Sequence, residues 1–288
     1  MEKWSHTKID TFIRCPEMFR KRYIERIKPK IKAKPLALGS CIAAGLSAFR
    51  KVGTFEAASE AYMRTWVAEG RILSATKEED PIRSIERTLE ILEAYTVLYQ
   101  DEPKQIIQPE INFDEEIAPD IWFRGRIDGV IQDRNGVGII EDKTASRLGD
   151  YWFTEKGNSY QIKWYMFIAN KLGLFDLSDR NLPRATLNAI YIHAKEMRFR
   201  REPVLKMKQE IKAAGDDLLA WINHIQLCVK NNSFPHADYS TCAQYGGCDF
   251  LPLRRASGEM LERLIDASYI RSESEVFTEP GSVSKTIV

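Results

Sequence analysis

The most restrictive feature of this sequence is the stretch from Phe123 to Thr144, FRGRIDGVIQDRNGVGIIEDKT. Apolar residues alternate with other residues through its first half, turn-forming residues follow at 133–136, and an apolar run, VGII, resumes at 137–140. This pattern is typical of two antiparallel strands joined by a tight turn. We therefore expect a β-hairpin with a buried second strand.

The hairpin carries two carboxylates and a lysine whose relative position depends on the turn. With a turn at 134–135, Asp128 lies opposite Glu141, and with a turn at 135–136 it lies opposite Lys143. Because side chains alternate along a strand, both registers place the three residues on one face, with cross-strand Cβ atoms about 5 Å apart. Such a group at the end of an apolar hairpin predicts a divalent-metal site.

The chemistry of a divalent ion explains why these residue types would be placed together. Mg²⁺ and Mn²⁺ prefer carboxylate and carbonyl oxygens, and a water bound to them loses its proton more easily. A lysine beside that water can orient it, help to deprotonate it, or neutralise charge that builds on a phosphate. The alternative is that Glu141, Asp142 and Lys143 form an ordinary solvated triplet. The Asp on the preceding strand and the apolar run before the triplet favour the metal site.

Three elements in order along the chain carry a resemblance to a known family. Asp128, Glu141-x-Lys143 and Gln161-x-x-x-Tyr165 resemble the PD-(D/E)XK nuclease superfamily. The Gln-x-x-x-Tyr element is similar to that of its RecB-like branch, which includes the AddB-type and CRISPR-associated exonucleases. The N-terminal SHTKIDTFIRCPEMFRKRY also resembles the opening segment of that branch. The resemblance runs from about residue 5 to about residue 253 and depends on the order and spacing of the motifs.

The resemblance implies a Mg²⁺- or Mn²⁺-dependent deoxyribonuclease. The activity would be that of an exonuclease on single strands or duplex ends, in DNA recombination, repair or phage DNA processing. Asp128 and Glu141 would hold the metal with the backbone carbonyl of Asp142, and Lys143 would position the attacking water. Gln161 and Tyr165 would align the strand. The alternative is a nuclease-like protein, catalytically weak or inactive, that binds DNA or a protein partner.

Several further residues are candidates for binding metal or DNA. Glu110, on the strand expected before the hairpin, is either a further metal ligand or a paired surface glutamate. Arg124 and Arg126 share a face with Asp128, where they would hold flanking phosphates or form salt bridges at the sheet edge. The predicted helix 7–27 has a basic face that includes Arg20 and Arg22. Such a face is able to follow a DNA backbone, although a solvated helix face explains the same charges.

One residue of the RecB-like pattern is missing. Members of that branch usually carry a metal-binding histidine in the helix that corresponds to residues 36–50 of this chain, and the aligned residue here is Ala43. His6 lies too early in the sequence to replace it. Ala43 therefore weakens the expected metal site and motivates the alternative of a protein that binds without cutting.

The cysteines suggest a second site of uncertain chemistry. In many RecB-like nucleases one N-terminal and three C-terminal cysteines hold a [4Fe–4S] cluster that joins the two ends of the chain. Cys15, Cys242 and Cys248 correspond to three of them, and Leu253 stands near the place of the fourth. Either the three thiolates hold a cluster with a labile fourth position, or the segment closes by packing without metal. The missing ligand favours the second alternative.

Composition agrees with a single globular unit. The chain has 288 residues, 44% hydrophobic and 29% charged, with a net charge of +1, so any basic surface for DNA must be local. We find no apolar run of ~18 residues and no signal peptide. We therefore expect a cytoplasmic protein (in the host cytoplasm if it is phage-encoded) that does not bind membranes. Its implied partners are DNA and recombination or helicase proteins.

The predicted fold is α/β, with a mixed central sheet of four or five strands flanked by helices, similar to the restriction-endonuclease-like core, and with a helical insertion. We expect one RecB-like nuclease domain over residues 1–270, with the terminal segments folded against each other. Its parts are a helical region at about 36–100, a catalytic sheet core at about 105–200, and a C-terminal helix and cysteine loop at about 203–270. Residues 271–288 are expected to form a disordered tail.

Overall fold

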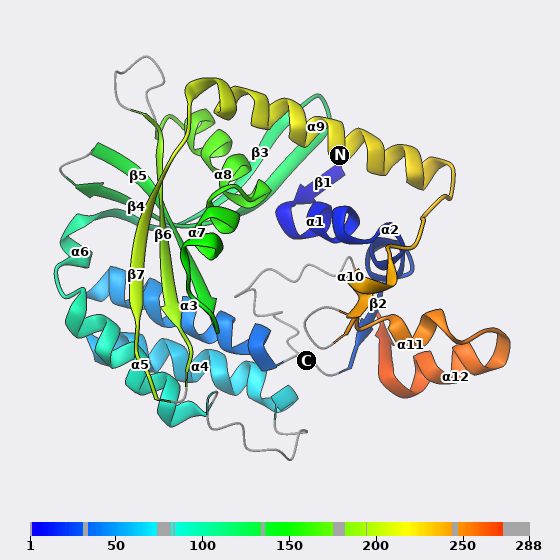
Figure 1. The fold of residues 1–288 in the computed structure, drawn as a ribbon, viewed down its shortest axis with the longest axis horizontal. Helices are drawn as coiled ribbons and strands as arrows, with labels where there is room; N and C mark the ends of the chain where they lie inside the picture. Colours follow the sequence, from blue (N-terminus) through cyan, green and yellow to red (C-terminus); the bar gives the residue numbers. More distant parts are fainter. Residues whose placement is uncertain are drawn as a thin grey trace, which may run out of the picture.

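The computed structural model describes residues 2–30, 34–73, 82, 84–133, 136–174, 182–193, 195–243 and 247–272. At its centre is a six-stranded mixed sheet of order β1-β4-β5-β6-β7, in which β3 also pairs with β4 (Figure 1). The predicted mixed sheet flanked by helices is confirmed, with one strand more than expected. The strands are β1 (Glu2–Ser5), β3 (Ile106–Ala118), β4 (Ile121–Asp133), β5 (Gly136–Ala145), β6 (Arg184–Tyr191) and β7 (Phe199–Leu205).

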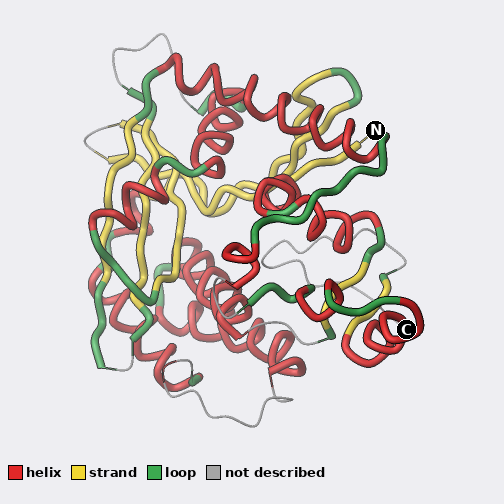
Figure 2. The backbone as a smooth tube through the Cα atoms, turned by 45° about the vertical axis from the view of Figure 1, so that its right-hand side comes forward, coloured by secondary structure: helices red, strands yellow, loops and turns green. Residues whose placement is uncertain are grey.

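Helices cover the sheet from two sides and form two apolar cores (Figure 2). The first core joins the sheet to the helices α1 (His6–Arg14), α7 (Asp150–Gly157), α8 (Tyr160–Lys171) and α9 (Lys208–Lys230). The second core joins the end of β6 to the expected helical insertion, which consists of α3 (Lys34–Val52), α4 (Phe55–Leu73) and α5 (Ile85–Leu98). A four-residue helix, α6 (Glu102–Gln105), leads from the insertion into β3. Across the part of the chain that the structure describes, no helix is both long and apolar enough to span a bilayer.

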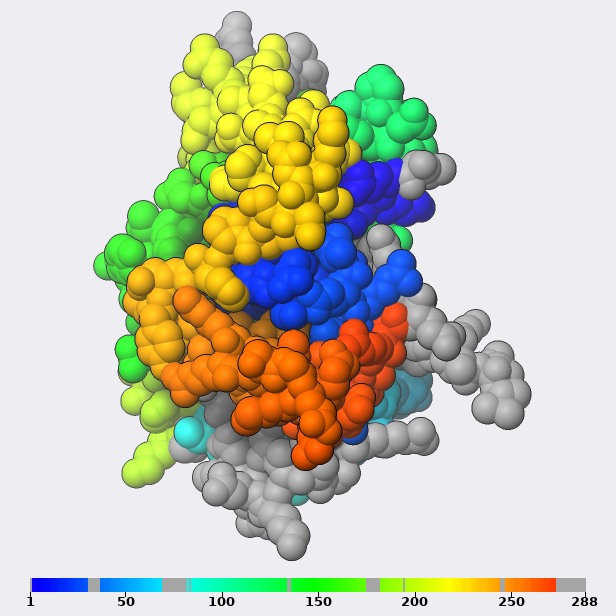
Figure 3. All heavy atoms as spheres, turned by 90° about the vertical axis from the view of Figure 1, so that its right-hand side faces the viewer, coloured from blue at the N-terminus to red at the C-terminus, as the bar shows by residue number. Residues whose placement is uncertain are grey.

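The two ends of the chain lie against each other. Strand β2 (Ile27–Pro29) pairs with β8 (Tyr269–Arg271) in an antiparallel ladder. Figure 3 shows the C-terminal segment, in orange and red, packed directly on the N-terminal segment, in blue. The helices of this region are α10 (Tyr239–Ala243), α11 (Leu251–Arg254) and α12 (Gly258–Ser268).

Three predicted boundaries are wrong. The helix expected over residues 7–27 is divided, because Cys15 is extended (φ −164°, ψ 109°) before Pro16, as steric contact with a proline ring requires. The chain continues as α2 (Pro16–Phe19) and a π-helical turn, η1 (Arg20–Ile24). At the other end, residues 203–205 belong to β7, so α9 begins at Lys208. The predicted tail begins too early, since Arg271 is in β8. The rest of the predicted tail, from residue 273, lies outside the described residues.

Candidate active site

The candidate site lies where strand β4 exchanges one neighbour for another. Along one edge, β3 pairs with β4 over most of its length. The other edge is shared: β1 pairs in parallel with residues 121–124, and β5 pairs antiparallel with residues 129–133. Neither strand pairs with residues 125–128, which we call the β4 fork. On this edge, residues 125–128 therefore lie between the ends of two different strand pairings.

The hairpin register brings Asp128 opposite Glu141. Gly129 pairs with Ile140 and Asp133 pairs with Gly136, which selects the first of the two expected registers; residues 134–135 themselves lie outside the described part. At the fork, the backbone N–H of Asp142 donates a hydrogen bond of 2.9 Å to Oδ2 of Asp128. The carboxylate of Asp128 thus holds the end of β5 where the ladder between the two strands has stopped.

Glu141, Lys143 and Gln161 form a closed triangle of hydrogen bonds on this face. The Lys143 ammonium donates to Oε1 of Glu141 and, over 2.8 Å, to Oε1 of Gln161. The Gln161 amide donates in turn to Oε1 of Glu141 over 2.7 Å. Helix α8 places Gln161 there because Ser159 caps its N-terminus and Trp164 and Ile168, farther along the helix, anchor it in the core. The structure therefore brings together four of the residues expected from the sequence, Asp128 included.

One carboxylate oxygen of this group lacks a partner. Glu141 is only 1% exposed, and its buried Oε2 accepts no hydrogen bond from the described residues. Buried polar atoms normally have a partner, and an exception of this kind is expected where a ligand binds. A carboxylate oxygen suits a hard divalent cation, so Asp128 and Glu141 fit the metal that the sequence predicts.

The electrostatics of the pair point the same way. Burial, followed by the negative charges of Glu141 and Asp142, raises the pKa of Asp128 to about 8. Burial also raises the pKa of Glu141, although the Lys143 charge acts against it. Two carboxylates that repel each other in a buried site are stabilised as anions by a cation, which is the condition for a pH-dependent metal site.

Lys143 is charged in this arrangement. Burial alone would lower its pKa, but the charges of Glu141 and Asp128 outweigh burial and the pKa is raised. A protonated lysine has no free electron pair with which to take a proton from water. Of the three roles considered for Lys143, orienting a water and neutralising phosphate charge fit this structure, and acting as the base does not.

Glu110 lies at the same fork, on the opposite neighbour of β4. Its backbone has φ of 66°, an uncommon conformation for a non-glycine residue and one that is often found at functional sites. Its Oε2 accepts a hydrogen bond of 3.0 Å from the Ser47 hydroxyl of α3, and Arg126 lies 3.7 Å from the same oxygen. Arg126 also lies 3.9 Å from Oδ1 of Asp128. The salt-bridge alternative for Arg126 is therefore realised, at distances long enough to leave its role toward DNA open.

The remaining expected residues lie farther from the carboxylates. The Tyr165 ring is buried against Phe113, and its hydroxyl approaches β4 closely at Gly125, where an added Cβ would lie 3.0 Å from it. Arg124 is half-buried on β4 and is the residue directly before the fork. Arg20 and Arg22 are engaged elsewhere. Arg20 forms ion pairs with Glu17 and Glu25, and Arg22 lies 3.6 Å from Asp249.

His6 lies near the site, although it is far from the hairpin in the sequence. It follows β1, whose parallel pairing with β4 ends at Ser5, and its ring packs edge-on against Trp164 and Tyr165. Burial, followed by the charge of Lys143, lowers the pKa of His6 to about 3, so the imidazole is neutral at physiological pH. The sequence carried no signal for this placement, because a four-residue strand pairing across more than 100 residues has no local pattern.

Ala43 lies on the side of α3 that faces the strands of the site. Gly39, four residues before it, approaches Thr144 of β5, since an added Cβ would lie 3.7 Å from the threonine hydroxyl. Ser47, four residues after it, contacts Glu110. Residues spaced by four lie on one face of a helix, so Ala43 lies between two contacts with the sheet.

A buried polar network centred on Arg50 stabilises strands β4 and β5. The Arg50 guanidinium donates two hydrogen bonds, of 2.6 and 2.7 Å, to the Asp142 carboxylate and one of 3.2 Å to the backbone oxygen of Asp128. It also donates to Glu102 over 2.7 Å, and Asn188 donates to Asp142 over 2.7 Å. Although burial acts against it, the charge of Arg50 and these hydrogen bonds hold the pKa of Asp142 below its ordinary value. Tyr95 and Arg201 complete the network around Glu102.

Comparison with known proteins gives the class to which this fold and site belong. A family model for the PD-(D/E)XK nuclease superfamily matches residues 3–253, nearly the whole chain. The chain belongs to this superfamily, whose members are nucleases that typically use divalent metals such as Mg²⁺. A search of curated proteins found no match.

The first prediction tests the support behind the site. Arg50→Met should lower the free energy of unfolding by about 3–5 kcal/mol, because it leaves Asp142 buried without its cation. Urea unfolding followed by circular dichroism measures this. The control is Arg64→Met, which breaks the Arg64–Glu60 pair on an exposed helix face and should change the free energy by less than about 1 kcal/mol. Equal losses in the two variants would show that the network does not support the sheet.

The second prediction concerns pH in the absence of metal. With a raised pKa, Asp128 binds a proton in the folded state that the unfolded chain has released. The stability that this proton confers is complete below the ordinary aspartate pKa of 3.8 and is lost as the pH rises through about 8. Asp128→Asn should therefore be more stable than the wild type at about pH 9 and less dependent on pH. Chemical unfolding in chelator measures this, and Asp216→Asn, on the exposed face of α9, should keep the wild-type slope.

Proposed function

We propose that this protein is a Mg²⁺- or Mn²⁺-dependent deoxyribonuclease that acts as an exonuclease on single strands or duplex ends. The observation that carries the proposal is the pair at the β4 fork. There Oε2 of Glu141 is buried without a partner among the described residues, and Asp128, whose pKa is raised, lies opposite it. If these carboxylates served only in structural ion pairs, each of their buried oxygens would have a partner. The unpartnered oxygen of Glu141 instead leaves this pair of carboxylates able to bind a cation.

The residues of the site would divide the work as follows. Asp128 and Glu141 would hold the ion with the backbone carbonyl of Asp142, and Glu110 lies near enough on β3 to contribute. A bound divalent ion supplies charge that polarises a phosphate and makes a bound water more acidic. The Lys143 ammonium would orient the attacking water and neutralise charge on the phosphate, because it is protonated in this site.

Gln161 and Tyr165 would act on position rather than on bond breaking. Gln161 holds the Lys143 ammonium and Oε1 of Glu141 at fixed distances, so it aligns the charged groups with one another. The Tyr165 hydroxyl lies close to Gly125, at one end of the fork, where it would limit how deeply a DNA strand can enter. Arg126 and Arg124, on β4 beside the carboxylates, would bind the phosphates next to the one that is cleaved. Arg20 and Arg22 would need to leave their ion pairs to bind DNA.

The finer assignment is supported by the motifs alone. The Gln161-x-x-x-Tyr165 element and the N-terminal segment are similar to those of the RecB-like branch, and with that branch would come a role in recombination, repair or phage DNA processing and helicase or recombination partners. The alternative function, a nuclease-like protein that binds DNA without cutting, is favoured by one observation, the alanine at position 43. The two predictions that follow separate these alternatives.

Cleavage should depend on Glu141 and Lys143. Glu141→Gln and Lys143→Met should each reduce cleavage of end-labelled DNA by at least about a thousandfold, the scale of losing a group that stabilises transition-state charge. Without metal, Glu141→Gln should unfold within about 1 kcal/mol of the wild type, since it removes one of two like charges from a buried site. Lys143→Met should be less stable than the wild type, because it leaves Glu141 buried without its cation. The assay uses single- and double-stranded DNA with Mg²⁺, Mn²⁺ or chelator, and Glu155→Gln, remote on α7, is the control. Wild-type cleavage in either variant would place the active site elsewhere.

The cost of Ala43 can be measured as metal affinity. Two carboxylates and a carbonyl leave more positions to water and phosphate than a site with an added imidazole, so we expect weak metal binding without DNA and a preference for Mn²⁺. Ala43→His should tighten Mn²⁺ binding in a calorimetric titration, because the residue lies between two contacts of α3 with the sheet. Ala44→His, one residue away on the helix, is the control. Unchanged affinity with a stability loss of about 1–3 kcal/mol would mean that position 43 is packed and does not face the ion.

A further inference from the structure

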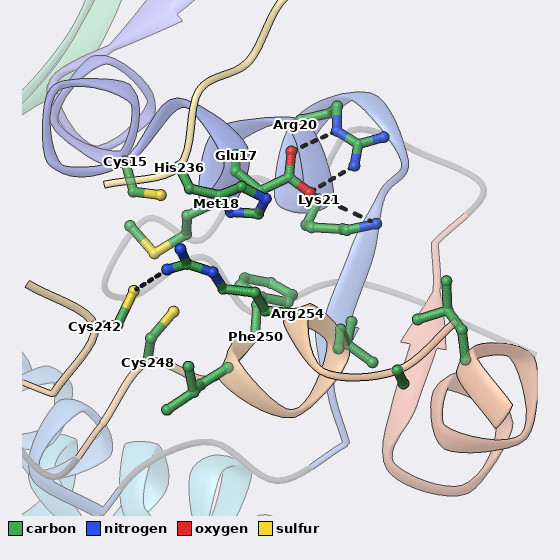
Figure 4. A pocket seen from close by; sticks show the side chains of 14 residues that line it. Cys15, Glu17, Met18, Arg20, Lys21, His236, Cys242, Cys248, Phe250 and Arg254 are labelled. Carbon is green, nitrogen blue, oxygen red and sulfur yellow. Dashed lines mark hydrogen bonds and ion pairs between the residues drawn. The ribbon is translucent and has the colours of Figure 1, made fainter. Parts of the chain in front are cut away.

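A cavity of about 220 Å³ lies between the N-terminal and C-terminal segments of the described chain. It is bordered by three cysteines: Cys15, and Cys242 and Cys248, which follow it by more than 200 residues in the sequence. The lining also includes His236 and Arg254 (Figure 4). We call this set of five residues the cysteine clasp. The structure thus confirms that the three cysteines gather in one place.

The cysteine clasp does not have the donor set of an iron–sulfur cluster. A [4Fe–4S] cluster is normally held by four cysteine thiolates, and the clasp offers three. Leu253, near the expected place of the fourth, lines the same cavity with an apolar side chain that is 4% exposed and packs with Ile27 and Phe250. In the view of Figure 4 the ring of His236 points away from the three sulfurs. Among the described residues, no three His, Cys, Asp or Glu side chains are arranged to hold one ion.

The side chain of Arg254 brings a positive charge next to the cysteines. The Arg254 guanidinium extends from α11 toward the cysteines, and its Nη1 donates to Sγ of Cys242 over 3.7 Å. The same nitrogen donates to the backbone oxygen of Ala237 over 3.5 Å. Figure 4 shows the guanidinium among the cysteine sulfurs. A positive group at this point repels a metal cation and occupies space that a cluster would need.

The hydrogen bonds of Arg254 belong to a chain that joins three segments. The backbone N–H of Ala237 donates to Sγ of Cys15 over 3.5 Å, and the N–H of Glu17 donates to the backbone oxygen of Pro235 over 3.3 Å. Through Ala237, Arg254 therefore connects α11 to the start of α2. Burial, followed by the nearby sulfurs of Cys242 and Cys15, raises the pKa of the Cys248 thiol.

We propose that Arg254 takes the place of a metal group in the cysteine clasp, and that its hydrogen bonds to Cys242 and Ala237 join the two ends of the chain without iron or zinc. The three cysteines then act as small, partly buried groups that accept hydrogen bonds. This inference concerns a region remote from the carboxylates and is independent of the proposed nuclease activity. Its tests accordingly use metal content and hydrogen exchange, and need no DNA.

The first test replaces the cation by a fourth thiol. Wild type, Arg254→Cys and Arg255→Cys are incubated anaerobically with equal amounts of Fe²⁺ and Fe³⁺ and with sulfide, desalted, and assayed for bound iron and for the visible absorbance of thiolate-to-iron charge transfer. Arg255 is the matched control, because it is adjacent in sequence but bonds to Tyr239 outside the cavity lining. We expect stoichiometric iron in Arg254→Cys only, with circular dichroism showing that all three proteins are folded.

Two results would overturn the proposal. Iron bound stoichiometrically by the wild type would show that the guanidinium does not exclude a cluster, and an Arg254→Cys protein that is folded and takes up no iron would show that residue 254 is not at the vacant ligand position. The same incubation with Zn²⁺ tests the histidine: one zinc per wild-type chain, lost in His236→Ala, would make the clasp a zinc site and contradict the inference.

The second test asks whether Arg254 holds the segments together. Hydrogen exchange of the metal-free protein, followed by mass spectrometry, is compared for wild type, Arg254→Ala and Arg263→Ala, the last on an exposed helix pair with Glu259. Exchange over residues 235–243 should become about tenfold faster in Arg254→Ala, the change expected from one lost hydrogen bond to a charged group. Arg263→Ala should match the wild type there. Wild-type exchange rates over residues 235–243 in Arg254→Ala would mean that the guanidinium does not stabilise the contact between these segments.

Discussion

The buried guanidinium of Arg50 makes the rest of this arrangement possible. It lies 1% exposed between two carboxylates, those of Asp142 and Glu102, and it also bonds to the backbone oxygen of Asp128. Without a cation on that side, the negative charges of Asp128, Glu141 and Asp142 would all be concentrated at the ends of two adjacent strands. Arg50 neutralises Asp142 on one side of β5, so the other two carboxylates alone are left for a divalent ion on the opposite side. The alternation of side chains along β5 thus separates a structural charge from the two proposed to bind metal.

The topology of β4 decides where that separation is useful. A strand paired on both edges offers little access to its backbone, but β4 is paired with β1 at one end and with β5 at the other, and its residues 125–128 have no partner on that edge. The N-terminal strand brings His6 to one side of this opening, and β5 brings Glu141 to the other. Helix α8 then reaches both sides, with Gln161 bonded to Glu141 and Tyr165 packed near His6. A neutral imidazole beside a charged lysine is compatible with this site because it adds no repulsion.

Much of this arrangement could be predicted from the sequence where the interacting residues are close together in the chain. Contacts between residues far apart in the chain could not be predicted. The hairpin and the shared face of Asp128, Glu141 and Lys143 follow from local alternation and turn residues, so they were predicted correctly. The pairing of β1 with β4 and the position of His6 depend on a parallel contact between distant segments. The partner of Asp142 is similarly remote, since Arg50 lies in a helix with no acidic residue near it in sequence. Physical chemistry predicts that buried charges find partners, but not which ones.

The β4 fork and the cysteine clasp illustrate opposite ways of balancing charge. At the β4 fork, carboxylates face one another with an unsatisfied oxygen, and the missing component is a cation from solution. In the cysteine clasp, the cation is supplied by the chain itself as Arg254, and the groups around it are neutral thiols and a backbone carbonyl. A site that must exchange its ion with each substrate gains from an unsatisfied acceptor, because binding then releases repulsion. A site that only joins the chain ends gains from a partner that cannot dissociate. In our two proposals, compensation of charged and polar groups therefore comes from a bound cation in one place and from the chain itself in the other.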